Sequence, residues 1–257
     1  MTGTVYLIGA GPGAPDLLTL RAARLLAAAD IVFHDALVHP DTLALAERAE
    51  KIAVGKRCGK HSTAQRFINK RLVDAARNQS IVVRLKGGDP MLFGRAQEEL
   101  AALEAAGVRY EVVPGVTAAL AAAAALATSL TQRGLARSVA FVTPRVGEGE
   151  DASDWVRSLI NADAGAIYMG ARQAAEIAKE LIAAGKSAST PVAIVENASL
   201  AETHTEFTTL ATLSHAAPTD RRGPAVILIG PQFRARDRAL GSAFEERGSN
   251  VARKAHG

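Results

Sequence analysis

Cysteine, aromatic residues and long hydrophobic runs are all scarce in this chain. Of its 257 residues, one is a cysteine (Cys58) and 4% are aromatic. A single cysteine cannot form an intramolecular disulfide, which excludes a disulfide scaffold and gives no reason to expect an oxidising compartment. The longest uncharged apolar run, residues 118–127, covers about half of the roughly 20 residues that a membrane span needs. The first residues do not resemble a secretion signal, so we expect a cytoplasmic protein that does not cross a membrane.

A strong excess of charge of one sign is also missing from most of the chain. The formal net charge is +4, from 30 Lys and Arg against 26 Asp and Glu. Residues 234–257 carry most of this excess, and we interpret them as a basic, disordered tail. The remainder is nearly balanced, so we predict no nucleic-acid partner. One local exception is residues 51–73, which hold seven Lys or Arg and no acid. This stretch would suit a polyanionic ligand.

Short β-branched runs alternate with helical patterns from end to end, which predicts an α/β fold with largely parallel strands. The length suits two domains that can each bury a core. We place the boundary near Pro114, where a strand closes and the pattern begins again. The expected units are an N-terminal α/β domain (1–114), a C-terminal α/β domain (115–233) and the tail (234–257). We expect strands at 4–9, 31–33, 51–54, 81–85, 110–113, 138–143, 165–169, 191–195, 205–209 and 225–229, and helices at 15–29, 62–77, 96–106, 116–127, 152–160 and 173–184.

A glycine-rich loop, residues 9–13, follows the first expected strand and precedes a helix. Glycine allows a sharp turn and close approach of a ligand to the main chain. Two functional interpretations compete with a plain β-to-α turn. One is a dinucleotide site, and the other is the ligand site of the family named below. A dinucleotide site would use Gly9, Gly11 and Ala14, with Asp35 as the ribose-binding acid, and would make the protein an NAD-dependent oxidoreductase. Pro12 argues against a dinucleotide site, because proline lacks the amide donor that a bound pyrophosphate would need.

A second motif, Lys86-Gly87-Gly88-Asp89-Pro90, stands at the end of another expected strand. Open α/β sheets bind ligands at the carboxyl ends of their strands. The two glycines offer bare backbone beside a carboxylate acceptor, but a simple Gly-Asp-Pro turn gives the same pattern. Taken alone, this motif does not distinguish a ligand site from a simple turn.

Both motifs belong to a longer ordered series of segments. The first loop continues into Leu17–Ala22, and the second into Phe93-Gly94 and Val113-Pro114-Gly115. This series resembles the two motifs of the tetrapyrrole (corrin/porphyrin) methylases, over about residues 3–232. Further segments are similar to those of the members that methylate uroporphyrinogen III: His34–Val38, Val54–Arg57, Pro114–Ala119, Arg133–Ser138, Tyr168–Gly170 and Gly223–Ala225.

The resemblance implies two α/β domains with S-adenosylmethionine in the cleft between them, in a homodimer. It implies methyl transfer to carbons 2 and 7 of uroporphyrinogen III, giving precorrin-2 on the way to sirohaem or cobalamin, with S-adenosylhomocysteine as the other product. The first glycine loop would then lie on the substrate side rather than bind a dinucleotide. A methylase of a later precorrin and a non-catalytic tetrapyrrole-binding protein remain as alternatives. By the same resemblance the cofactor pocket is lined by Pro12, Gly87, Gly88, Asp89, Leu92, Thr117, Ala118, Met169, Ala198, Pro224 and Ala225.

Methyl transfer from a sulfonium donor needs alignment and exclusion of water, and no metal. The pyrrole carbon that attacks leaves positive charge on the ring, and a nearby carboxylate can stabilise that charge and accept a proton. Asp35 is our candidate, at a position to which the family assigns a general base; an acid that caps the following turn is the alternative. Lys56 matches a family position proposed as a proton donor, although binding of a substrate carboxylate explains the same cation.

Other polar residues fit the same interpretation less directly. We expect Arg84, Lys86, Arg133 and Arg137 to join the basic stretch in attracting the eight carboxylates of the substrate. For Arg66, Lys70 and Arg71 we favour a solvated helix face instead. Cys58 and His61 are too few ligands for a zinc site, so we predict no metal. The chain departs from usual family residues in ways that bear on substrate rather than on class, at Ala14, His34, Ala96, Gln97, Gln132, Pro144, Arg145, Ala198 and Ser199.

Overall fold

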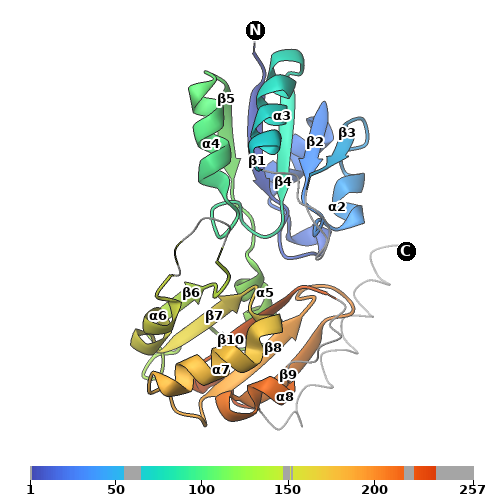
Figure 1. Cartoon of the computed structure of the whole chain (residues 1–257). Helices are drawn as coiled ribbons and strands as arrows, with labels where there is room; N and C mark the ends of the chain where they lie inside the picture. The colour runs from blue at the N-terminus through green and yellow to red at the C-terminus, as the bar shows by residue number, and fades with distance from the viewer. Residues whose placement is uncertain (1, 55–64, 147–150, 152, 217–222, 236–257) are drawn as a thin grey trace, which may run out of the picture.

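The computed structural model describes residues 2–54, 65–146, 151, 153–216 and 223–235 of the chain (Figure 1). Two five-stranded sheets organise the molecule, the first in the upper part of Figure 1 and the second in the lower part. The first sheet has the strand order β3-β2-β4-β1-β5, and each adjacent pair is parallel. Its strands are β1 (Thr4–Gly9), β2 (Ile31–His34), β3 (Glu50–Ala53), β4 (Ile81–Lys86) and β5 (Arg109–Val113).

Helices cover both faces of the first sheet. Apolar side chains of α3 (Gln65–Asn78) and α4 (Ala96–Ala105) pack with Val5, Leu7 and Val82 on one face. The opposite face holds α1 (Leu20–Ala28), which packs with Ile8, Val83 and Leu85 among others. Residues 81–86 are therefore buried on both faces, as expected for a central parallel strand.

The expected helix over residues 15–29 is interrupted. Pro15–Leu17 forms a single 3-10 turn, and α1 begins only at Leu20. Thr19 has extended backbone angles and its hydroxyl accepts a hydrogen bond from the Ala22 amide at 3.1 Å. This capping bond satisfies a free amide of the first turn and so fixes the helix start there. The short α2 (Pro40–Ala44) and α8 (Leu213–Ala216) were not predicted.

The second sheet has the order β6-β7-β10-β8-β9, and it corrects the expectation of largely parallel strands. Only β6 and β7 pair in parallel, whereas β10 is antiparallel to β7 and to β8, and β9 is antiparallel to β8. The seven residues 197–203 between β8 and β9 explain the reversal of β9, since a parallel crossover needs a dozen or more residues. The strands are β6 (Val139–Val142), β7 (Ala164–Tyr168), β8 (Pro191–Glu196), β9 (His204–Thr209) and β10 (Ala225–Ile229).

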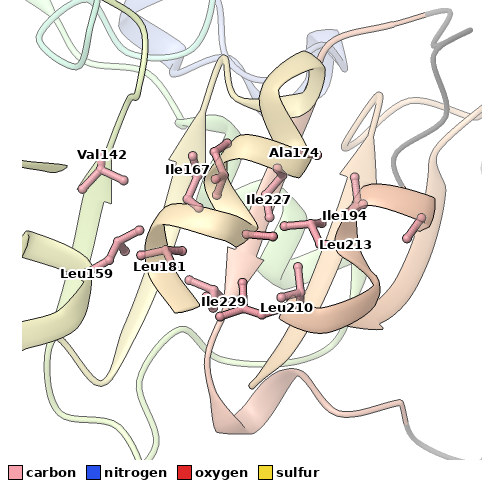
Figure 2. Close-up of a cluster of buried hydrophobic side chains, with 14 residues drawn as sticks. Val142, Leu159, Ile167, Ala174, Leu181, Ile194, Leu210, Leu213, Ile227 and Ile229 are labelled. Atoms are coloured by element: carbon pink, nitrogen blue, oxygen red, sulfur yellow. The ribbon is translucent and has the colours of Figure 1, made fainter. Parts of the chain in front are cut away.

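The core of this second sheet also has two sides. On one face, α6 (Trp155–Asn161), α7 (Ala174–Ala183) and α8 pack onto the strands, and Figure 2 shows the shared cluster of apolar side chains, which includes Leu181 and Leu213 of the helices and Ile194 and Ile227 of the strands. The other face carries α5 (Ala118–Ala125), whose alanines lie against Ala166, Ala193 and Leu228. Small side chains let this helix approach the sheet closely. No helix in the described part of the chain combines the length and apolar character that a membrane span requires.

Candidate functional site

The two glycine motifs are bonded to each other. They follow β1 and β4, which are adjacent parallel strands, so both loops leave the same edge of the first sheet. The Gly88 amide donates to the Gly11 carbonyl at 2.8 Å, and the Gly11 amide donates to the Gly88 carbonyl at 3.2 Å. The Ala10 amide also donates to the Lys86 carbonyl, at 2.7 Å. The structure thus joins into one unit the two motifs that the sequence presents separately.

A third glycine packs into this unit. A Cβ placed on Gly9 would lie 2.6 Å from the Cα atom of Gly115, and one placed on Gly115 would lie 2.8 Å from the Cα atom of Gly9 and against the carbonyl oxygen of Gly88. All three contacts are with backbone, which cannot move aside as a flexible side chain can. We call Gly9, Gly88 and Gly115 the glycine crossing.

Asp89 ties the second loop to the segment that follows β5. Its Oδ2 accepts from the Gly115 amide at 2.9 Å, and its Oδ1 accepts from the Met91 amide at 2.8 Å. The Leu92 amide donates to the Asp89 carbonyl at 3.3 Å. Asp89 therefore fixes the turn in which Leu92 lies. Gly87 is exposed, and a Cβ there would meet only the Leu37 Cβ, at 3.7 Å. An open backbone platform remains beside a fixed acid.

Tyr168, at the end of β7, brings the second sheet to these loops. Its hydroxyl lies 2.7 Å from the Thr117 hydroxyl and accepts from the Ala119 amide at 3.1 Å. Its ring lies 5.2 Å, between centroids, from that of Phe93, which follows the second glycine motif. Burial raises the pKa of the Tyr168 phenol, so it stays protonated and able to donate. Thr117 in turn lies near Gly88, whose Cβ would be 3.9 Å from the Thr117 Cα.

The remaining predicted cofactor residues lie at the same end of the second sheet. Met169 follows Tyr168 directly, and Ala118 begins α5. Ala225 pairs with Glu196 in the β10–β8 ladder, and the Asn197 amide donates to the Pro224 carbonyl at 2.9 Å. This places Ala198 beside the start of β10. We use the name junction site for residues 9–14, 34–35, 86–93, 115–118, 168–169, 196–199 and 223–225.

Four non-glycine residues of the junction site have left-handed backbone angles. Their φ values are +53° for Phe93, +57° for Met169, +51° for Asn197 and +79° for Ser199. Such conformations cost about 1–3 kcal/mol each and persist where the surroundings fix them, which happens most often at binding sites. The concentration of strain here indicates a pre-organised site.

The first glycine loop also contacts the β8–β9 loop. The Ala14 amide donates to the Ser199 hydroxyl at 3.1 Å, and a Cβ on Gly13 would lie 3.0 Å from the side chain of Leu200. Pro12 stands in this loop, half-buried. A cavity of about 640 Å³ opens beside the contact, although none of the predicted cofactor residues lines it. Its lining is Ala14, Asp16, Leu17, Ala121, Ala124, Ala125, Ser199, Leu200, Thr203, His204 and Thr205.

Arg84 and Lys86 contradict the expectation that they attract the substrate. Both side chains are buried, with 4% exposed, and both bind the fully buried Glu99 of α4. Arg84 also forms an ion pair with Asp35, at 2.5 Å between Nη2 and Oδ1. Alternation along β4 turns both cations toward α3 and α4, where a buried charge needs a partner. Arg133 and Arg137, in contrast, are exposed.

The pKa values of the two buried cations shift in opposite directions. Burial lowers the pKa of the Arg84 guanidinium, but the negative charges of Asp35 and Glu99 outweigh it, and the net shift is upward. Burial and the adjacent charge of Arg84 lower the pKa of Lys86, against the opposing effect of Glu99. Arg84 is therefore a permanent cation beside Asp35. His34 precedes Asp35, and its Nδ1 lies 3.1 Å from the Asp35 carbonyl.

Several predictions fall on residues outside the described part of the chain. These are Lys56, the Cys58 and His61 pair, and nearly all of the tail. Among the residues that the structure describes, no group of three or more His, Cys, Asp or Glu is arranged to hold a metal. No functional role was predicted for Glu99, Tyr168 or Ser199, although Tyr168 begins a segment that is similar to the family and Ser199 is a departure from it. For Glu99 a signal existed, since two cations on one face of a buried strand require an anion opposite.

The family model of the Tetrapyrrole (Corrin/Porphyrin) Methylases matches residues 4–214. The chain belongs to this family. The membership agrees with the ordered motifs of the sequence and does not favour the NAD-dependent oxidoreductase that the first glycine loop left open. It also fits the two-sheet α/β architecture, which solved structures of the family share.

Solved structures resemble this tetrapyrrole methylase along most of its length. A uroporphyrin-III C-methyltransferase from Thermus thermophilus, complexed with S-adenosylhomocysteine, is 41% identical with a TM-score of 0.79; the match covers 89% of this chain and 98% of that one. The cobalt precorrin-4 methyltransferase CbiF is 32% identical with a TM-score of 0.78, over 90% of this chain and 96% of that one.

Curated relatives are longer proteins. The siroheme synthase of Sodalis glossinidius is 45% identical over 232 residues, which is 89% of this methylase but 48% of the relative. Siroheme synthase 1 of Yersinia enterocolitica is 46% identical over the same shares. The chain thus spans about half the length of the curated relatives that it matches.

Proposed function

We propose that this methylase transfers methyl groups from S-adenosylmethionine to carbons 2 and 7 of uroporphyrinogen III and so produces precorrin-2. The observation that carries the proposal is the similarity to the Thermus enzyme, which spans 98% of that chain and was solved with the demethylated cofactor bound. The bonded glycine loops at the junction of the two sheets support it, because they supply a site of the matching kind. The product would feed sirohaem or cobalamin synthesis.

The junction site suits S-adenosylmethionine by its shape. At Gly87 a side chain would occupy open space, so bare backbone is available for a ligand to approach. Asp89 fixes that backbone through the Met91 and Gly115 amides, and Tyr168 contacts the Thr117 hydroxyl. We include Met169, which follows Tyr168, in the same cofactor site. We propose Pro12, Leu92, Ala118, Ala198, Pro224 and Ala225 as further parts of the cofactor wall. When bound, the cofactor supplies an electrophilic sulfonium methyl group.

The chain's own part in the reaction is alignment, exclusion of water and charge stabilisation. Asp35 stands at the end of β2, next to the strand that carries the second glycine motif, and its side chain is 28% exposed. We assign its carboxylate to the positive charge that develops on the macrocycle and to the proton that the ring then loses. We assign Lys56 to a substrate carboxylate or to proton donation. The exposed Arg133 and Arg137 would help to attract the polyanion.

The proposal also covers the domain boundaries and the oligomeric state. We propose two domains, 1–114 and 115–233, followed by the basic tail, and a cytoplasmic homodimer that needs no metal. The chain passes from the first sheet to the second through β5, residues 114–117 and α5. Pro114 lies within that connection.

The test is an incubation of the purified protein with S-adenosylmethionine and enzymatically generated uroporphyrinogen III. A dimethylated product with the absorbance of precorrin-2 once oxidised is expected, and mass spectrometry would count the methyl groups. Partly methylated precorrins offered in parallel identify a methylase of later precorrins if they alone react. Binding of S-adenosylhomocysteine without any turnover would indicate a non-catalytic tetrapyrrole-binding protein.

A further inference from the structure

A chain of buried charges runs from α4 to the junction site. Glu99 accepts from the Arg84 Nε at 3.0 Å through one oxygen and from the Lys86 Nζ at 2.9 Å through the other. Arg84 extends its Nη2 in the opposite direction, to the Oδ1 of Asp35 at 2.5 Å. Two anions and two cations thus balance one another, and three of the four side chains are almost completely buried.

Asp35 is the member of this group that meets solvent. Its side chain is 28% exposed, whereas those of Arg84, Lys86 and Glu99 are exposed by 4% or less. Arg84 occupies Oδ1, and among the described residues no donor contacts Oδ2. One oxygen therefore serves as the attachment to the core, and the other is available to a ligand.

The guanidinium has almost no freedom to turn. Besides the two carboxylates, its Nη1 donates to the Leu85 carbonyl at 3.1 Å, so Arg84 is held by α4, by its own strand and by the end of β2 together. A planar fork with donors on three nitrogens is what such a position requires, and a lysine ammonium cannot span the same partners. Glu99, shared with Lys86, fixes the far end of the fork.

Stability alone does not account for this arrangement. Removing two charges from water costs free energy that their attraction repays only in part, and apolar replacements of similar volume are often as stable. The one exposed end of this buried charge network is a candidate catalytic carboxylate. The network is therefore suited to holding that carboxylate in place.

We propose that Arg84 is a positioning residue, which acts through Asp35 by holding its Oδ1 so that Oδ2 is presented to the tetrapyrrole ring. Glu99 and Lys86 anchor Arg84. The inference rests on the proposed function, because Asp35 acts on the ring only if this chain methylates a tetrapyrrole.

A double-mutant cycle tests it. Arg84→Lys keeps the charge and loses the fork; it is made alone and together with Asp35→Ala, and methyl transfer is followed with labelled S-adenosylmethionine. Misplacement of a catalytic group by about 1 Å can lower the rate about 100-fold. We expect a fall in kcat of that order for Arg84→Lys, with unchanged affinity for S-adenosylhomocysteine and little change in KM. In the Asp35→Ala background the same substitution should change kcat by less than about twofold.

The matched control is Arg77→Lys, which makes the same exchange at an exposed ion pair with Asp74 in the same half of the chain. It should leave kcat unchanged in both backgrounds. Equal losses from Arg84→Lys with and without Asp35 would overturn the proposal, because Arg84 would then act independently. A loss of cofactor affinity in Arg84→Lys would overturn it as well.

A second measurement covers the case in which Arg84→Lys does not fold. Asp35→Ala leaves Arg84 without one of its two counter-charges, so it should melt several degrees below the wild type, more than Asp74→Ala, which breaks exposed pairs only. Equal melting temperatures for the wild type and Asp35→Ala would show that Arg84 is not attached to Asp35. A wild-type protein without methyl transfer would refute the proposed function, and the melting comparison would still decide the attachment.

Discussion

The hydroxyl of Tyr168 lies 2.7 Å from the hydroxyl of Thr117, and this contact joins the end of β7 to the start of α5. The same tyrosine ring meets Phe93, which comes from the turn after the second glycine motif. One side chain therefore connects three separate segments of the junction site. The next residue, Met169, has a left-handed backbone with a φ of +57°.

Tyr168→Phe should weaken cofactor binding while the fold persists. The phenyl ring keeps its contacts with Phe93 and Phe141, but the hydrogen bonds to Thr117 and Ala119 are lost. At about 0.5–1.5 kcal/mol for a hydrogen bond, the affinity for S-adenosylhomocysteine should fall roughly 2- to 10-fold. Titration calorimetry measures this. The exposed Tyr110→Phe is the control, and equal affinities of the two variants would contradict the prediction.

Gly115→Ala should destabilise the protein through the glycine crossing. The new methyl group would press on the carbonyl of Gly88 and on the Cα of Gly9, and overpacking of this kind costs about 1–3 kcal/mol. Gly107→Ala serves as the control, since no atom lies within 4 Å of its Cβ and only the left-handed backbone (φ +65°) is penalised. Thermal melting should place Gly115→Ala clearly below Gly107→Ala; the reverse order would show that the crossing can relax.

Gly87→Ala should leave the stability of the protein nearly unchanged and weaken cofactor binding. Its Cβ would make only an ordinary contact with Leu37, at 3.7 Å, so the free energy of unfolding should change by less than about 0.5 kcal/mol. The methyl group would, however, cover the open backbone platform beside Asp89. We expect the affinity for S-adenosylhomocysteine to fall more than about tenfold, which is a loss of at least 1.4 kcal/mol. Full affinity in calorimetry would place the cofactor elsewhere.

Asp35→Ala should lower methyl transfer strongly and change cofactor affinity by no more than a few fold. The carboxylate is assigned to the macrocycle, not to the donor, and removal of a general base typically costs about 100- to 10,000-fold in rate. Single-turnover assays and calorimetry on the same preparation separate the two effects. Collapse of cofactor binding would show that Asp35 has another role.

Asp163 gives a prediction about pH. Hydrogen bonds from the Arg137 and Ser138 amides and the Ser138 hydroxyl lower its pKa from the ordinary value of 3.8. Because the unfolded chain binds a proton more readily, the stabilisation is complete above about pH 4 and is lost as the pH falls through the lowered pKa. Asp163→Asn should therefore melt below the wild type at pH 7, and the difference should shrink in acid. A difference independent of pH would mean that the charge plays no part.

Much of the fold could be predicted from local patterns. The strand at 225–229 was placed with its observed bounds, and the strand at 81–85 to within one residue, because runs of Val and Ile between turn residues are distinctive. Strand direction was harder. Runs that are buried on both faces look alike in parallel and antiparallel sheets, so the reversed β9 and β10 were missed, although the short connection 197–203 argued for a hairpin.

The site was predictable where glycine and proline mark it, and not where its contacts join distant segments. Gly87 and Asp89 are recognisable from their motif, while the bond of Tyr168 to Thr117 joins residues 51 positions apart. Arg84 shows the limit most clearly. Its charge suggested a role in attracting substrate, but alternation along a buried strand turns it inward to Glu99, and only the three-dimensional packing reveals that partner.

The glycine crossing brings together the backbone of three distant stretches of sequence within the junction site. A side chain on Gly9 would press on the backbone of Gly115 and Gly88, and one on Gly115 would press on the backbone of Gly9 and Gly88. Substitutions at Gly9 and Gly115 are thereby constrained, and we expect changes in ligand preference to come from the surrounding residues. Those surrounding residues can be substituted one at a time, whereas Gly9 and Gly115 can be replaced only together with a shift of the backbone that they contact.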